Sequence, residues 1–140
     1  MDSWGDRFMT KIAEYTLLFI LMIYFHIIDD FYLQGILAKL KQKEWWETIF
    51  PGNKMYDCDY IIALLLHAFS WAVTVHIPVF FIYHAYSLPL FLGAFVLHAI
   101  IDDLKANKKV FGLVIDQLLH IAQITFLWMF YVTVYRGLNV

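Results

Sequence analysis

Residues 60–84, YIIALLLHAFSWAVTVHIPVFFIYH, decide the fold because they form a long apolar run without Asp, Glu, Lys or Arg. A helix needs about 20 residues to cross the hydrocarbon core of a bilayer, and this run is longer. Polar and apolar residues do not alternate along it as they would in a half-buried strand. Lipid also offers no hydrogen-bond partners to an open sheet. We therefore predict a membrane-spanning helix over 60–84.

Three further apolar stretches accompany this run, over residues 12–37, 86–104 and 110–135. Each is long enough to span a bilayer. The chain is 62% hydrophobic and 16% charged, whereas soluble domains carry about 25% charged residues. A soluble chain of 140 residues has no interior large enough to bury so much apolar surface. We predict an all-α fold, a membrane-embedded four-helix bundle that covers residues 1–140 as a single domain.

The stretch between the first two apolar runs, residues 39–59, differs in composition. It begins with KLKQKEWWE at 39–47, where lysines alternate with other residues before paired tryptophans. This pattern is typical of an interfacial helix, with tryptophan rings at the headgroups and lysines near the phosphates. A solvated loop is the alternative interpretation. We predict an interfacial segment here, with the lipid bilayer as its partner.

Basic residues in the short loops predict the orientation. Residues 39–59 and 105–109 hold seven lysines, namely Lys39, Lys41, Lys43, Lys54, Lys105, Lys108 and Lys109. The opposite side has Arg7, Lys11 and Arg136. Because cytoplasmic loops are enriched in Lys and Arg, the loops 39–59 and 105–109 should face the cytoplasm, in a bacterial inner membrane. The formal net charge of −2 argues against a nucleic-acid partner.

Polar residues inside the apolar runs gather toward one end of the bundle. They lie in the C-terminal halves of runs one and three and the N-terminal halves of runs two and four, and these halves meet if successive helices alternate in direction. The set comprises the pairs His26 and Asp30, His98 and Asp102, Asp116 and His120, together with His67. Members of each pair are four residues apart and share one helix face. Because buried ionisable groups are costly in a membrane, this cluster is a candidate functional site.

Imidazole and carboxylate ligands suit Zn²⁺, Mn²⁺ or Fe²⁺ better than soft copper ions. We predict that these seven residues bind a divalent metal, and their number leaves room for two ions. Gln34, Gln117 and Lys105 are predicted to orient the ligands. A metal-free hydrogen-bonded network is the open alternative. Two further aspartates, Asp29 and Asp103, are interpreted as helix-end or headgroup-facing charges.

The order of these motifs carries a family resemblance. The chain contains His26-x-x-x-Asp30-Phe31-x-x-Gln34, then His67, then His98-x-x-x-Asp102-x-x-Lys105, then Asp116-Gln117-x-x-His120. It resembles the small bacterial and phage membrane proteins grouped as domain of unknown function 3307, over about residues 18–130. The acidic doublets at 29–30 and 102–103 and the long first loop depart from that pattern. The resemblance implies the site residues and a membrane location, and it implies no particular activity.

Three functions remain open at this point. In a metal-dependent hydrolase acting on a lipid or lipid phosphate, Asp30, Asp102 and Asp116 would be the catalytic carboxylates. Lys105 and the lysines of 39–43 would then attract an anionic headgroup. In a phage or bacterial accessory protein the cluster would be structural, and in an ion- or proton-coupled transporter it would bind a travelling ion. A transport pathway would require a homo-oligomer, and polar groups confined to one end favour a site over a channel.

Overall fold

The computed structural model describes residues 4–136, and this part of the chain is helical with no strand. The elements are α1 (Trp4–Ile27), the π-helix η1 (Ile28–Leu33), α2 (Leu37–Leu40), α3 (Lys43–Ile49), the 3₁₀ turn η2 (Lys54–Tyr56), α4 (Asp59–Tyr83), α5 (Leu88–Ala106) and α6 (Leu113–Arg136). The predicted all-α class is confirmed. Residues 1–3 and 137–140 of the predicted 1–140 domain lie outside the described residues.

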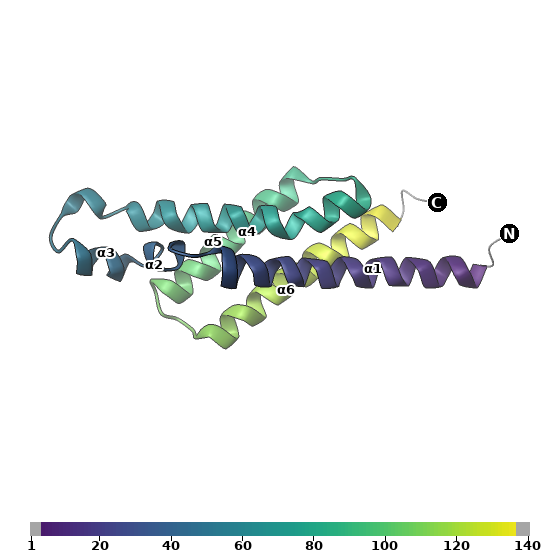
Figure 1. Ribbon diagram of the computed structural model, residues 1–140, viewed down its shortest axis with the longest axis horizontal. Coiled ribbons are helices and arrows are strands. Elements are labelled where there is room, and N and C mark those ends of the chain that lie inside the picture. Colours follow the sequence, from purple (N-terminus) through teal and green to yellow (C-terminus); the bar gives the residue numbers. More distant parts are fainter. Residues whose placement is uncertain (1–3, 137–140) are drawn as a thin grey trace.

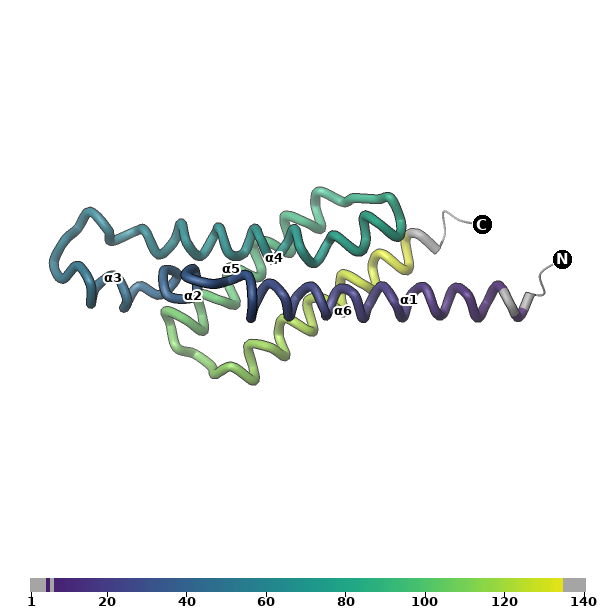
Figure 2. Tube along the Cα trace, viewed as in Figure 1, coloured from purple at the N-terminus to yellow at the C-terminus, as the bar shows by residue number. Residues whose placement is uncertain are grey.

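Four long helices make up the body of the molecule, and successive ones run in opposite directions (Figure 1). Helix α4 packs against α1 and α5, and α6 packs against α1 and α5. Helices α2 and α3 lie at the end of the bundle opposite the start of α1, as the chain trace shows (Figure 2). This alternation brings together the helix halves that carry the polar residues.

Three segments are long and apolar enough to cross a membrane: Arg7–Leu33, Lys54–Tyr83 and Leu113–Val134. Helix α5 does not join them, because its last turns carry Asp102, Asp103 and Lys105. The described residues therefore give three candidate spans where the sequence predicts four. Large apolar side chains such as Phe81 cover the outside of the molecule, which is consistent with membrane insertion.

The first predicted helix, 12–37, is where the boundaries differ most. Regular α-helix ends at Ile27, and the π-helical turn η1 follows. In a π-helix the backbone N–H bonds to the carbonyl oxygen five residues earlier, as Gln34 N does to Asp29 O at 3.0 Å. Two consecutive acidic side chains, Asp29 and Asp30, are buried in this turn. The π-helix ends at Leu33, and the turn that follows contains Gly35, whose φ of +47° suits glycine. The predictions 60–84, 86–104 and 110–135 match α4, α5 and α6 to within three residues at each end.

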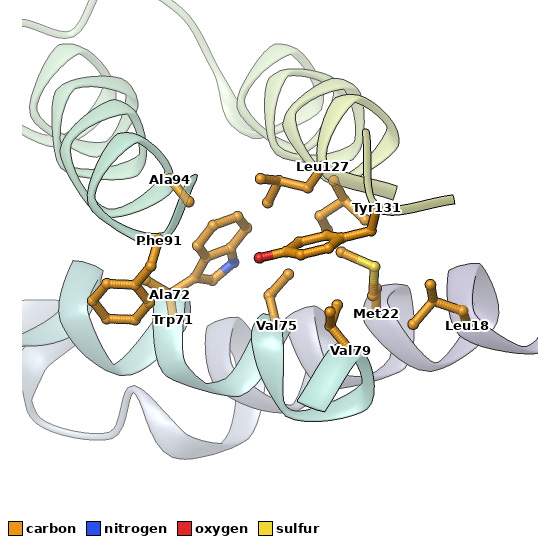
Figure 3. Packing of buried hydrophobic residues seen from close by; sticks show 11 residues of the cluster. Leu18, Met22, Trp71, Ala72, Val75, Val79, Phe91, Ala94, Leu127 and Tyr131 are labelled. Carbon is orange, nitrogen blue, oxygen red and sulfur yellow. The ribbon is translucent and has the colours of Figure 1, made fainter. Parts of the chain in front are cut away.

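An apolar core fills the half of the bundle nearer the start of α1. Its buried members are Leu18, Met22, Trp71, Ala72, Val75, Val79, Phe91, Ala94, Ile124, Leu127 and Tyr131, which come from all four long helices. Figure 3 shows Trp71 and Tyr131 in the middle of this cluster. In a bilayer, where lipid is as apolar as these side chains, close van der Waals packing would hold this half together.

The 39–59 segment folds into two short helices and a 3₁₀ turn, and it is fixed to the end of α5 by Asn107. The Asn107 Nδ2 donates to the carbonyl oxygen of Lys41 at 3.1 Å, and its Oδ1 accepts from the backbone N–H of Lys43 at 2.8 Å. A helix carrying Trp45 and Trp46 is present as predicted. Its position at a membrane surface stays a prediction.

Candidate metal centre

The structure brings all seven predicted side chains into one buried cluster. Asp30 comes from η1, and the others come from α1, α4, α5 and α6. Its members are His26, Asp30, His67, His98, Asp102, Asp116 and His120; six are at most 2% exposed, and the side chain of Asp30 is 7% exposed. Groups from distant parts of the sequence are therefore neighbours in space.

One group with metal-ligand spacing consists of Asp30, His67 and His98. The Nε2 of His67 lies 3.4 Å from Oδ1 of Asp30 and 3.2 Å from Nε2 of His98. The Nε2 of His98 lies 4.0 Å from the same Asp30 oxygen. A tetrahedral ion with bonds near 2.1 Å holds its ligand atoms about 3.4 Å apart. The three atoms are therefore close to the separation that an ion between them would require.

A second group consists of His98, Asp102 and His120, so it shares His98 with the first. The Oδ1 of Asp102 lies 3.4 Å from Nε2 of His120, while its Oδ2 lies 3.2 Å from Nε2 of His67. The imidazole rings of His98 and His120 are stacked with centroids 4.2 Å apart. Asp102 thus turns one carboxylate oxygen toward each side of the cluster.

His26 lies in the cluster but belongs to neither group. Trp71 Nε1 donates to its Nδ1 at 2.8 Å, and an indole N–H can only donate. The neutral His26 ring therefore carries its proton on Nε2, which donates to Oε1 of Gln117 at 3.1 Å. Both nitrogens therefore have partners in the protein, and the role of His26 as a ligand stays a prediction.

The glutamines predicted to orient the ligands do contact them. Gln117 Nε2 donates to Oδ2 of Asp30 at 3.2 Å and to Oδ2 of Asp116 at 3.1 Å. The Nε2 of Gln34 lies 2.9 Å from Nε2 of His67, so this imidazole nitrogen accepts from the amide. The proton of a neutral His67 then lies on Nδ1, which faces a carboxylate oxygen of Asp29 at 3.5 Å.

Asp116 joins the cluster to a partly exposed lysine. Its Oδ2 accepts a hydrogen bond from the ammonium of Lys105, the third residue predicted to support the site. Its Oδ1 lies 3.4 Å from Nε2 of His120. Asp116 is fully buried and the Lys105 side chain is 31% exposed, so this pair connects the interior to the surface. Like His26, Asp116 belongs to neither group with metal-ligand spacing.

Sequence reasoning missed Lys41. We expected its ammonium to reach toward headgroups with the rest of the 39–43 run, and that expectation is wrong. Lys41 is 7% exposed, and its Nζ donates to Oδ2 of Asp102 at 2.5 Å. Asn107 anchors the backbone around Lys41 and so turns this lysine inward. No signal in the sequence separates it from Lys39 and Lys43.

Asp29 was also misplaced, because a helix-end or headgroup-facing position was expected. The structure buries it to 1% exposure, and Ser70 Oγ donates to its Oδ1 at 2.6 Å. Asp29 and Asp30 both lie in the π-turn η1, which the sequence pattern did not reveal.

The charges of the cluster do not balance with neutral imidazoles. Four buried carboxylates, from Asp29, Asp30, Asp102 and Asp116, face only two ammonium groups, from Lys41 and Lys105. Four negative and two positive charges leave two negative charges, and uncompensated buried charge is strongly unfavourable. One divalent cation would supply the missing charge, and two protons would do the same. The cluster could therefore hold a metal ion.

Unpaired polar atoms point to the same place. Oδ1 of Asp30 and both ring nitrogens of His120 are buried without a hydrogen-bond partner within residues 4–136. Buried polar groups of this kind are rare in folded proteins. An ion held by Asp30, His67, His98, Asp102 and His120 would give Oδ1 of Asp30 and Nε2 of His120 a partner.

No protein-family model, no curated protein and no solved structure matches this chain. The resemblance to the domain of unknown function 3307 family stays a prediction. Function is therefore inferred from the geometry of the His/Asp cluster.

Proposed function

We propose that this chain is an integral membrane protein whose four long helices cross the bilayer, and whose buried His/Asp cluster binds a divalent transition-metal ion. The fourth span would be α5. Its outer surface exposes Leu92, Val96 and Ile100, as a lipid-facing helix would. Its acidic end would be tolerated because Asp102 is paired with Lys41 inside the protein.

The observation that carries the proposal is the convergence of ligand atoms from four elements. Oδ1 of Asp30 and Nε2 of His67 and His98 lie 3.2–4.0 Å from one another, with Asp102 and His120 beside them. Imidazole nitrogen and carboxylate oxygen favour Zn²⁺, Mn²⁺ or Fe²⁺. The residual charge of the cluster favours one ion. Two ions remain compatible with the number of ligands if Asp102 bridges them.

Metal analysis tests the proposal directly. We expect protein purified in detergent without chelator to carry about one equivalent of Zn²⁺, Mn²⁺ or Fe²⁺ by inductively coupled plasma mass spectrometry, and chelated protein to rebind Zn²⁺. His98→Ala should lose this binding, because His98 belongs to both groups. His84→Asn is the matched control: His84 is exposed and has a φ of 49°, which asparagine tolerates. Wild-type protein that neither carries nor rebinds metal would contradict the proposal.

A second function, hydrolysis of a phosphate-bearing lipid, rests on the Lys105–Asp116 pair. This pair connects the buried cluster to the surface on the side where the lysine-bearing loops lie. When bound, the ion would act as a Lewis acid and would help to activate water. Asp116 would accept the proton of the attacking water, Lys105 would protonate the departing alcohol, and the P–O ester bond would break.

Phosphate release from phosphatidic acid in mixed micelles tests this activity. We expect Asp116→Asn to lower the turnover by about 10²–10⁴-fold and to retain bound metal, since Asp116 belongs to neither ligand group. Lys105→Gln should also lower turnover. Wild-type protein that binds metal but releases no phosphate would contradict hydrolysis alone, and would leave a metal-binding accessory protein or an ion-coupled transporter as the function to test.

A further inference from the structure

An apolar groove lies on the outer surface between the second half of α4 and the start of α5. Its volume is about 340 Å³, and Phe69, Val73, Phe80, Phe81 and Phe91 are among its lining residues. Phe81 is 70% exposed and Phe80 is 55% exposed, so the groove opens toward the surroundings of the protein rather than into its core. In a bilayer the groove would be open to lipid.

His76 also lines this groove and is 4% exposed. It lies nine residues after His67 on α4, which is about 14 Å along the helix axis, so it does not belong to the His/Asp cluster. Phe91 and Tyr86 flank its ring, with centroids 5.6 and 6.4 Å away. An ionisable side chain is thus buried in aromatic surroundings.

One hydrogen bond fixes the tautomer of His76. Its Nδ1 lies 2.7 Å from the carbonyl oxygen of Ala72. A carbonyl oxygen only accepts, so the proton is on Nδ1. Because burial in apolar surroundings disfavours the charged ring, Nε2 then carries a lone pair and no proton. This nitrogen is buried without a hydrogen-bond partner in the described part of the chain.

We propose that this groove binds a membrane-dissolved aromatic alcohol, such as a phenol or a quinol, and that the His76 ring, whose Nε2 is buried, turns to accept a hydrogen bond from the ligand hydroxyl at this nitrogen. The aromatic walls suit a planar ring, and a cavity of this volume suits a ring with short substituents. An acyl chain would leave Nε2 without a donor. A quinone carbonyl would place one acceptor against another, so the hydroxylated form is preferred.

Binding of matched ligands to the protein in lipid nanodiscs tests this site. The probes are 4-butylphenol, its methyl ether 4-butylanisole and the carbonyl compound 4-butylbenzaldehyde, measured by saturation-transfer NMR against protein-free nanodiscs. We expect the phenol to bind about 5- to 10-fold more tightly than the other two, which is the effect of one hydrogen bond. Equal affinities, or no saturable binding beyond partitioning into lipid, would overturn the proposal without any variant.

Two substitutions sharpen the test. His76→Phe keeps the groove aromatic and removes the acceptor, so the preference for the phenol should vanish. His76→Gln retains an acceptor oxygen, so part of the preference should remain. A preference that persists in His76→Phe would show that another group recognises the hydroxyl and would overturn the assignment to His76.

Discussion

The two halves of the bundle use the same four helices in opposite ways. Toward α2 and α3 the interior holds the His/Asp cluster, and toward the start of α1 it consists mainly of apolar side chains such as Leu18 and Val79, with His76 as a buried polar residue that has no carboxylate beside it. Trp71 separates them: its ring stacks on His98 with centroids 4.2 Å apart, and it also belongs to the apolar core. The apolar half shows that this fold can be built without buried charge. Because buried charge is costly, the polar half is better explained by function than by stability.

The largest expected effect on the free energy of unfolding comes from removing a charge at the centre of the polar half. Asp102→Asn removes the negative charge that faces Lys41 and should destabilise the protein by about 3–5 kcal/mol, because it leaves a buried ammonium without its partner. The free energy of unfolding in mixed detergent micelles measures this change.

A double variant is the control for that experiment. Lys41→Met combined with Asp102→Asn removes both charges and should recover much of the lost stability. If the double variant is as unstable as the single one, the unpaired ammonium is not the cause of the loss.

Metal binding should add stability that depends on the His/Asp cluster and is independent of the apolar core. If the cluster binds Zn²⁺, free Zn²⁺ at one hundred times its dissociation constant should raise the free energy of unfolding by about 2.7 kcal/mol. Leu18→Ala, a change in the apolar core, should keep this increment. His98→Ala should lose it. An increment that survives His98→Ala would place the ion outside the cluster.

The sequence predicts the helices well because their signal is local. Long apolar runs, interrupted by polar residues at one end, suffice to predict the helices and the meeting of His67, His98 and His120. The i,i+4 spacing likewise anticipates the contact of Asp116 with His120 at 3.4 Å. These features follow from the regular period of the α-helix, which fixes the face on which each residue of an apolar run lies.

The remaining features depend on contacts between distant residues. Lys41 turns inward because Asn107, far away in sequence, holds its backbone. His26 is occupied because Trp71 donates to it, and nothing in the sequence pairs those two residues. Asp29 is buried in a π-turn, a local departure from the α-helix that periodicity does not reveal.

Trp71 provides a smaller test at the boundary between the halves. Trp71→Phe retains an aromatic ring but removes the donor to Nδ1 of His26, and should cost about 1–2 kcal/mol. The same substitution in a His26→Leu background should cost less, since no acceptor is then left unpaired. A double-mutant cycle of unfolding free energies measures the coupling. If the changes in unfolding free energy of the two substitutions were additive, the hydrogen bond between Trp71 and His26 would contribute no coupling between the two halves.

The smallest expected effect comes from a second lysine–carboxylate pair, Lys109 and Glu44, whose Nζ and Oε2 are 2.6 Å apart. Its side chains are 67% and 68% exposed, whereas those of Lys41 and Asp102 are 8% and 2% exposed. The hydrogen bond and charge of Lys109 lower the pKa of the Glu44 carboxyl below its ordinary value of 4.5. Any stability that this pair adds is present above that ordinary pKa and is lost as the pH falls through the lowered one.

Because water and salt screen exposed charges, Glu44→Gln should leave the free energy of unfolding at neutral pH unchanged within error. Lys109→Gln should return the pKa of Glu44 to its ordinary value, which an NMR titration of the side-chain carboxyl carbon would detect. The two pairs have the same chemistry and differ in burial, so they isolate what burial contributes. If Glu44→Gln destabilised the protein as much as Asp102→Asn, burial would not be the property that distinguishes the polar half from the surface.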